Sequence, residues 1–277
     1  MAYRLLALDL DGTAIELGQM PTPRVKQAVA AAEARGVRVV IATGRPYASA
    51  RKFQSAFEVD TPLICFQGAL VKEVIGDEIT LLAEPLPEEP LADVIALVEQ
   101  RGWDFNLYSE DFIYLARQRH PETFYERWFG LPCAPVQSLT DALRIMRDRG
   151  TAPLKGMFIG ESALIDCLTQ EVRESYSDRF AVVRSHTLFS EITAPGVSKG
   201  SALAFLARRY GISREETIAA GDNGNDVTMI EWAGLGVAVA NATPEAKAVA
   251  DWLAPSVAED GVAVLIDRFI LRDAIAS

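Results

Sequence analysis

Hydrophobic residues near the start of the chain are grouped into short continuous runs, and segments with helical spacing lie between these runs. The predicted strands cover residues 3–11, 37–44 and 62–68, and the predicted helices cover 22–36 and 47–57. Thr22 followed by Pro23 is a typical helix start, and Gly36 is a typical helix end. Continuous apolar strands separated by helices indicate a parallel sheet that is covered on both faces.

The same alternation returns toward the C-terminal end of the chain. Strands are predicted at 217–222 and 235–240, and helices at 198–212, 226–234, 243–250 and 261–276. We therefore expect both ends of the chain to contribute to one α/β domain, as is typical of alternating strands and helices.

The middle of the chain has a different hydrophobic pattern, with shorter predicted strands and more polar residues than the two ends. Helices are predicted at 87–102 and 161–176, and strands at 104–110, 112–117, 154–160, 180–185 and 188–193. This pattern predicts a second domain inserted into the first. The predicted fold class is α/β, with a parallel-sheet, Rossmann-like core formed by residues 1–83 and 191–277 and an inserted α/β domain formed by residues 84–190.

Composition and charge narrow the range of partners. The chain has 277 residues and a formal net charge of −11, and a surface of that sign repels polyanions, so no nucleic-acid partner is expected. No apolar run approaches the roughly 18 residues that span a bilayer, and no signal-peptide pattern opens the chain. Cys65, Cys133 and Cys167 form no metal-binding pattern and are interpreted as reduced packing residues. We expect a cytoplasmic protein without membrane contact; its oligomeric state is not predicted.

Polar residues follow three of the predicted strands, at the edge of the sheet where ligands of such folds bind. The first strand ends at Asp9 and Asp11, the second in Thr43-Gly44, and a late strand at Asp222. Lys199 lies in the first turn of a predicted helix, where its charge opposes the helix dipole unless an anion or a carboxylate faces it. Each feature alone is ordinary turn or surface chemistry, but together they indicate one site.

The residue types of this set indicate phosphoryl transfer. Oxygen ligands such as Asp9, Asp11 and Asp222 suit a hard cation, of which Mg²⁺ is the expected one. Thr43, Lys199 and the loop amides can hold phosphate oxygens. A carboxylate that faces a phosphate can act as a nucleophile and form an aspartyl-phosphate. A second acid, Asp11, could protonate the leaving oxygen and then activate water.

These segments resemble the motifs of the haloacid dehalogenase superfamily of phosphohydrolases. Asp9-Leu10-Asp11-Gly12-Thr13 matches the first motif, Thr43 the second, Lys199 the third, and "GDNGND" from Gly221 to Asp226 the fourth. The long insertion between the second and third motifs resembles that of the Cof-type subgroup, which carries a large α/β cap there. The chain departs from many members at Gln67, where they have Asn before Gly-Ala.

The resemblance also implies a role for each matching residue. Asp9 would be the nucleophile and a Mg²⁺ ligand, and Asp11 would be the general acid/base and bind Mg²⁺ through its backbone carbonyl. Asp222 would be the third metal ligand, and Asp226 would hold Lys199 or a metal-bound water. The phosphate-binding residues, with Leu10 acting through its backbone amide, would be Leu10, Thr43, Gly44, Lys199 and Asn225.

Capped members of this superfamily mostly hydrolyse small phosphate esters, which are sugar phosphates, nucleotide phosphates and phosphorylated cofactor precursors. The resemblance therefore implies a small phosphorylated metabolite as the substrate. Residues 103–129 contain nine of the 23 aromatic residues of the chain. This stretch could form a stacking surface for a planar leaving group, or it could form the core of the inserted domain. The alternation of Trp103, Phe105 and Leu107 as one strand face favours the core.

Two other functions share these motifs. A phosphomutase of the same superfamily would need a bisphosphate activator and would pass the phosphate to a second hydroxyl. A non-catalytic phospho-acceptor regulator would also use Mg²⁺ and an aspartate. Receiver domains of that kind are half this length and lack an acid at the position of Asp11. We therefore expect a phosphatase, and steady release of phosphate without an activator would distinguish it from both alternatives.

Overall fold

A computed structural model describes residues 2–75 and 77–272. The chain divides into two compact units. The first holds Met1–Gly44, Ala50–Leu81 and Ser198–Ser277, and the second holds Arg45–Ser49 and Leu82–Val197. The domain limits expected from the sequence, with residues 84–190 as the insert, lie close to these breaks and stay a prediction.

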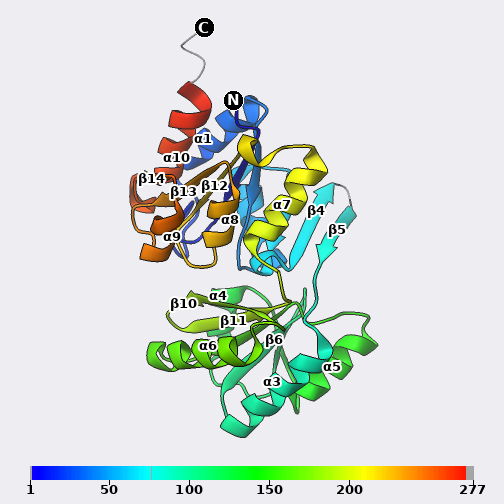
Figure 1. The fold of residues 1–277 in the computed structure, drawn as a ribbon. Coiled ribbons are helices and arrows are strands. Elements are labelled where there is room, and N and C mark those ends of the chain that lie inside the picture. Colours follow the sequence, from blue (N-terminus) through cyan, green and yellow to red (C-terminus); the bar gives the residue numbers. More distant parts are fainter. Residues whose placement is uncertain (1, 76, 273–277) are drawn as a thin grey trace. The chain divides into compact units, whose positions relative to one another are not determined.

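The first unit is built on a five-stranded sheet (Figure 1). Its strand order is β14-β13-β12-β1-β2, and every neighbouring pair is parallel. The strands are β1 (Leu5–Leu8), β2 (Arg38–Ile41), β12 (Thr217–Gly221), β13 (Leu235–Val239) and β14 (Trp252–Ala254). Strands β1 and β12 are buried along their whole length, as expected for a sheet with helices on both faces. The predicted α/β fold with a parallel core sheet is confirmed.

Helices alternate with these strands, as the hydrophobic pattern predicts. They are α1 (Pro23–Ala34), α2 (Tyr47–Phe57), α7 (Lys199–Tyr210), α8 (Val227–Trp232), α9 (Pro244–Val249) and α10 (Gly261–Ile266), the last continued by a π-helical turn at Asp267–Leu271. The predicted start of α1 is confirmed, because the Thr22 hydroxyl accepts a hydrogen bond from the Val25 amide. The last predicted helix, 261–276, is confirmed only as far as this turn, and residues 273–276 lie outside the described residues.

The order of the strands reverses between β1 and β12. The chain passes from β1 to β2 toward one edge of the sheet, and from β12 through β13 to β14 toward the other edge. The loops that follow β1 and β12 therefore diverge at their carboxyl ends, and this position is where open parallel sheets bind their ligands. Asp9 follows β1 directly and Asp222 follows β12 directly, so the topology places both acids at this point.

A small antiparallel sheet follows β2 along the chain. It contains β3 (Leu63–Cys65), β4 (Leu70–Ile75) and β5 (Asp77–Ala83), and a short turn at Phe66–Gly68 joins β3 to β4. The predicted strand at 62–68 is wrong beyond Cys65, because Phe66 and Gln67 have φ angles of 49° and 61°, which no strand adopts. Strands β4 and β5 are not among the predicted strands.

The second unit contains a six-stranded sheet with the order β10-β11-β9-β6-β7-β8. Its neighbours are antiparallel except for β7 and β8. The strands are β6 (Asp104–Tyr108), β7 (Ile113–Leu115), β8 (Cys133–Pro135), β9 (Lys155–Ile159), β10 (Ala181–His186) and β11 (Phe189–Thr193).

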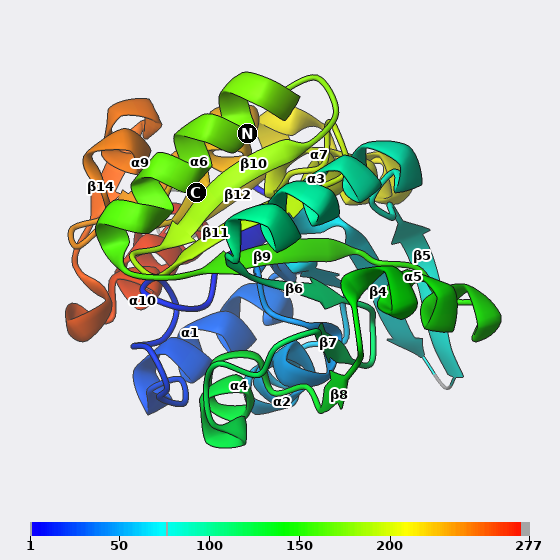
Figure 2. The same ribbon diagram turned by 90° about the horizontal axis from the view of Figure 1, so that it is seen from below.

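Three helices cover one face of this sheet (Figure 2). They are α3 (Glu88–Arg101), α5 (Leu139–Asp148) and α6 (Ser162–Tyr176), and their buried residues form one core with Phe105 and Phe158. On the other face, Phe129 of α4 (Glu122–Phe129) packs edge-on against Tyr108, with 5.4 Å between ring centroids. The aromatic stretch thus forms core contacts on both faces of the sheet, in agreement with the packing interpretation.

Within residues 2–75 and 77–272, no helix combines the length and the apolar character that crossing a bilayer requires.

Candidate active site

Asp9 lies at the centre of the site, immediately beyond the last residue of β1. Its amide continues the pairing of β1 with β12 and donates to the Ala220 carbonyl at 3.0 Å. The residue is only 5% exposed. Because its backbone extends a fully buried strand, the sheet itself fixes the position from which its carboxylate projects.

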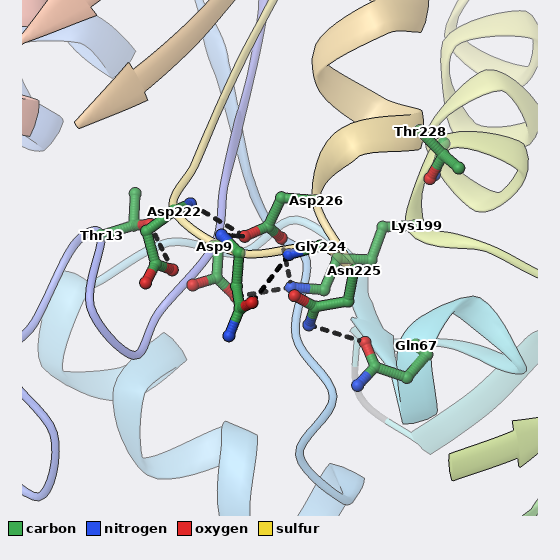
Figure 3. Close-up of polar contacts among 11 residues, drawn as sticks. Asp9, Thr13, Gln67, Lys199, Asp222, Gly224, Asn225, Asp226 and Thr228 are labelled. Atoms are coloured by element: carbon green, nitrogen blue, oxygen red, sulfur yellow. Dashed lines mark hydrogen bonds and ion pairs between the residues drawn. The ribbon is translucent and has the colours of Figure 1, made fainter. Parts of the chain in front are cut away.

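Lys199 faces Asp9 from the first turn of α7, as Figure 3 shows. Its Nζ lies 2.6 Å from Oδ1 of Asp9 and 2.6 Å from Oδ1 of Asp226, and the side chain is fully buried. A lysine at this end of a helix is unfavourable by itself, because its charge opposes the helix dipole. The two carboxylates in front of it supply the negative charge that a lysine at this position needs.

Asp226 organises the loop after β12. Its Oδ1 accepts the hydrogen bond from Lys199, and its Oδ2 accepts from the amides of Asp222 and Asn223 at 2.9 and 3.0 Å. Both oxygens of this fully buried carboxylate are therefore engaged within the chain. These contacts fix the loop that carries Asp222, and they include a direct contact between Asp226 and Lys199.

Asp222 is held from the opposite side by the first motif. The Thr13 hydroxyl donates to Oδ1 of Asp222 at 3.2 Å. A Cβ at Gly12 would collide with Oδ2 of the same carboxylate, and Gly12 has a φ of +90°, so this position requires glycine. The loop after β1 therefore encloses the acid that follows β12.

Burial and mutual repulsion raise the pKa values of the Asp9 and Asp222 carboxyl groups. Burial, followed by the charge of Asp226, raises the pKa of Asp9 well above its usual value, against the opposing effect of Lys199. The same two causes raise the pKa of Asp222 to about 7. Burial alone would lower the pKa of Lys199, but the charges of Asp226 and Asp9 outweigh it and raise that pKa. The site thus holds more negative charge than its own lysine balances.

The three carboxylates fit a divalent cation. Asp9, Asp222 and Asp226 each offer a carboxylate oxygen, and these oxygens all lie within 4.8 Å of one another. With all three carboxylates ionised, one ammonium leaves two negative charges at buried and half-buried positions, which is costly without a counter-ion. The donor set consists of oxygen alone, which hard cations prefer. The aspartate cluster therefore has the composition and spacing of a metal site.

The predicted role of Asp11 concerns its backbone carbonyl and its acidity, so the carboxylate cluster does not test it. The residue is half-buried and forms an isolated bridge with Ile15. Leu10 is fully buried, and its carbonyl accepts hydrogen bonds from the amides of Ala14 and Ile15, each at 2.9 Å. The first motif thus closes a tight loop directly after Asp9, and the roles of Leu10 and Asp11 stay predictions.

The second motif lies at the end of β2 and contacts the turn that follows β3. The Thr43 amide donates to the Ile64 carbonyl at 2.8 Å, and the Thr43 carbonyl accepts from the Gln67 amide at 3.2 Å. A Cβ at Gly44 would collide with the side-chain amide of Gln67. Gln67 in turn accepts a 3.0 Å hydrogen bond at Oε1 from Nδ2 of Asn225 (Figure 3). These contacts join the residues predicted to bind phosphate.

Three residues that contact the motif loops are not among the predicted site residues. Thr13 belongs to the first motif without a predicted role of its own, and Gln67 stands where many family members have Asn before Gly-Ala. Asn241 was not considered, yet its Nδ2 donates to the Gly12 carbonyl at 2.8 Å and its Oδ1 accepts from the Val257 amide at 2.9 Å. No local pattern marks Asn241, because its contacts lie far away along the chain.

A sequence model of haloacid dehalogenase-like hydrolases matches residues 6–266. The chain belongs to this family. The hydrolase is 32% identical over 277 residues to YxeH of Bacillus subtilis strain 168, covering 97% of this chain and 99% of that protein.

Two further relatives carry more specific names. The hydrolase is 28% identical over 270 residues to 5-amino-6-(5-phospho-D-ribitylamino)uracil phosphatase YcsE of Bacillus subtilis, covering 97% of this chain and 96% of that protein. The solved structure of the HAD subclass IIB sugar phosphatase BT4131 is 25% identical, has a TM-score of 0.79, and covers 96% of this chain and 98% of that chain. The protein is a Cof-type, subclass IIB phosphatase, a phosphoric monoester hydrolase, as the motifs predict.

Proposed function

We propose that this phosphatase hydrolyses small phosphorylated metabolites in a Mg²⁺-dependent reaction that passes through an aspartyl-phosphate on Asp9. The observation that carries the proposal is the contact of the buried Asp9 carboxylate with Lys199 inside a cluster of three aspartates. Buried charge of this kind is unfavourable for folding and is common at catalytic sites.

Mg²⁺ would be held by the side chains of Asp9 and Asp222 and by the backbone carbonyl of Asp11. When bound, it would act as a Lewis acid that offsets the negative charge of the phosphate group. Asp226 stays outside this ligand set in our proposal, because both of its oxygens already accept hydrogen bonds from Lys199 and from the loop amides.

The chemical steps follow from the positions of the two acids of the first motif. The Asp9 carboxylate attacks phosphorus, the bond between phosphorus and the ester oxygen breaks, and Asp11 donates a proton to the leaving alcohol. Asp11 then accepts a proton from water as this water attacks the aspartyl-phosphate, which releases inorganic phosphate and restores Asp9. Lys199, Thr43, Gly44, Asn225 and the Leu10 amide would stabilise the phosphate oxygens throughout.

The relatives support a phosphorylated polyol or sugar as the substrate class. The names of YcsE and BT4131 describe a phosphatase of a phosphoribityl compound and a sugar phosphatase. Both substrates named there are phosphate monoesters on hydroxylated carbon chains. We extend this class, and the cytoplasmic location that such metabolites imply, to the present protein as part of the proposal.

The test is a panel of sugar phosphates, polyol phosphates and nucleotide monophosphates assayed for release of inorganic phosphate. We expect release with Mg²⁺, none with a chelator, and recovery when Mg²⁺ is restored. A strict need for a sugar bisphosphate activator would instead indicate a phosphomutase. No release from any ester, with the protein folded and Mg²⁺ bound, would indicate a phospho-acceptor regulator.

A further inference from the structure

The turn at Phe66–Gly68 has an unusual backbone. Its three residues have φ angles of 49°, 61° and 105°, and the first two are not glycine. Phe66 is fully buried and Gln67 is 3% exposed. Bulky residues rarely adopt this left-handed region, and such strain persists where the surrounding structure requires it, often at functional sites. The left-handed backbone of Gln67 therefore needs an explanation other than the conformational preference of glutamine.

This turn contacts three of the four motif loops. The Gln67 amide donates to the Thr43 carbonyl of the second motif at 3.2 Å. A Cβ at Gly68 would collide with the Ser198 carbonyl, next to Lys199 of the third motif. The side chain of Gln67 accepts from Asn225 of the fourth motif at 3.0 Å. The turn thus joins loops that are widely separated along the chain.

The contact with Asn225 has a direct consequence for phosphate binding. A primary amide carries two N–H hydrogens, and one on Nδ2 of Asn225 is donated to Oε1 of Gln67. This bond fixes the orientation of the Asn225 amide group. It leaves the second hydrogen on Nδ2 for another acceptor. The Gln67 amide also lies against Gly44, whose missing side chain makes room for it. One glutamine therefore sets the positions of two proposed phosphate-binding residues.

We propose that Gln67 is a positioning residue for the phosphate group: it orients the Asn225 amide and packs against Gly44, so that the donors of both loops serve one phosphate. This inference rests on the proposed function and extends it to a residue that the motifs do not include. The left-handed backbone of Gln67 is the conformation in which its side chain reaches both loops, so the strain is retained for the sake of the contact.

Two variants separate the contact from the strain. Gln67→Met keeps the size of the side chain and the strained backbone but loses the acceptor, whereas Gln67→Gly loses the contact and also relieves the strain. The matched control is Glu58→Gly, since Glu58 is another left-handed non-glycine residue, with a φ of 60°, but is exposed. The readouts are the inhibition constant of inorganic phosphate, KM and kcat for one active ester, and the midpoint temperature of unfolding.

We expect both glycine variants to keep or raise the midpoint temperature. Gln67→Met and Gln67→Gly should each weaken the binding of inorganic phosphate about tenfold, with a matching rise in KM, which is the effect of losing about one hydrogen bond. Glu58→Gly should bind inorganic phosphate like the wild-type protein. In an Asn225→Ala background, Gln67→Met should have little further effect, because the two residues act as one unit.

Unchanged phosphate binding in Gln67→Met and Gln67→Gly would overturn the inference while leaving the proposed function intact. The inference would also be overturned if Gln67→Met weakened phosphate binding equally in the wild-type and the Asn225→Ala backgrounds, because Gln67 would then act independently of Asn225. If the wild-type protein neither releases nor binds inorganic phosphate, the proposed function fails, and this inference fails with it.

Discussion

Lys199 donates a 2.6 Å hydrogen bond to Oδ1 of Asp9, a residue 190 positions earlier in the chain. Both side chains are buried, and Asp226 lies at the same distance on another side of the ammonium. The pair thus joins the carboxyl end of β1 to the start of α7. In our account the same lysine holds the nucleophile in place and stabilises the phosphate group.

Removal of this lysine should destabilise the protein as well as inactivate it. Lys199→Met leaves Asp9 and Asp226 buried without their cation, and breaking a buried pair in this way costs about 3–5 kcal/mol. The free energy of unfolding in urea measures this loss. Lys199→Met with Asp226→Asn should recover part of it, while the exposed Lys52→Met should change stability by less than about 0.5 kcal/mol. A fully stable Lys199→Met variant would contradict this interpretation of the cluster.

Gly12 offers a test of the enclosure of Asp222. Gly12→Ala places a methyl group against Oδ2 of Asp222 at a residue with a φ of +90°, so it should displace the carboxylate and lower kcat/KM at least about 100-fold. Gly18→Ala is the matched control, because Gly18 has a φ of +79° and no atom near its missing Cβ. That variant should cost about 1 kcal/mol of stability and leave activity unchanged. Equal kcat/KM values for Gly12→Ala and Gly18→Ala would show that the close packing of Gly12 against Asp222 does not affect catalysis.

Asn241 should support the first motif from outside the site. It connects the Gly12 carbonyl to the Val257 amide, although its own side chain is exposed. Asn241→Ala removes both hydrogen bonds and should lower kcat/KM about tenfold through a looser loop. Asn241→Asp keeps the acceptor for Val257 but loses the donor to Gly12, so it should be similarly impaired. Steady-state kinetics with one ester compares the two variants. Wild-type kcat/KM in Asn241→Asp would show that the hydrogen bond with Val257, and not the one with Gly12, supports activity.

The fold class, and the meeting of Asp9, Asp222 and Lys199 at one edge of the sheet, could be predicted from the sequence. Asp9 and Asp222 could be placed together because each ends a continuous apolar strand, and the carboxyl ends of parallel strands meet at one edge of the sheet. Lys199 could be joined to them because its place at a helix start calls for nearby negative charge. These arguments depend on local pattern and on a general rule of topology.

Other features depend on contacts that no local pattern encodes. The apolar residues of "PLICFQG" continue through Phe66, so the sequence pattern predicts a strand across the left-handed turn at Phe66 and Gln67. The helix at Leu139–Asp148 was missed although Ser138 caps it through a hydrogen bond from the Asp141 amide, a signal that the sequence does contain. The contacts of Asn241 join distant segments, and only the folded chain shows them.

The central claim is that Asp9 becomes phosphorylated during turnover. The most direct measurement uses Asp11→Asn with p-nitrophenyl phosphate, whose leaving group needs little protonation, so that formation of the intermediate continues while its hydrolysis is slowed. After acid quenching and digestion, mass spectrometry should find one added phosphoryl group on the peptide that contains Asp9, and none in a variant that also carries Asp9→Asn. A phosphoryl group on another residue, or steady turnover by Asp9→Asn alone, would contradict the account.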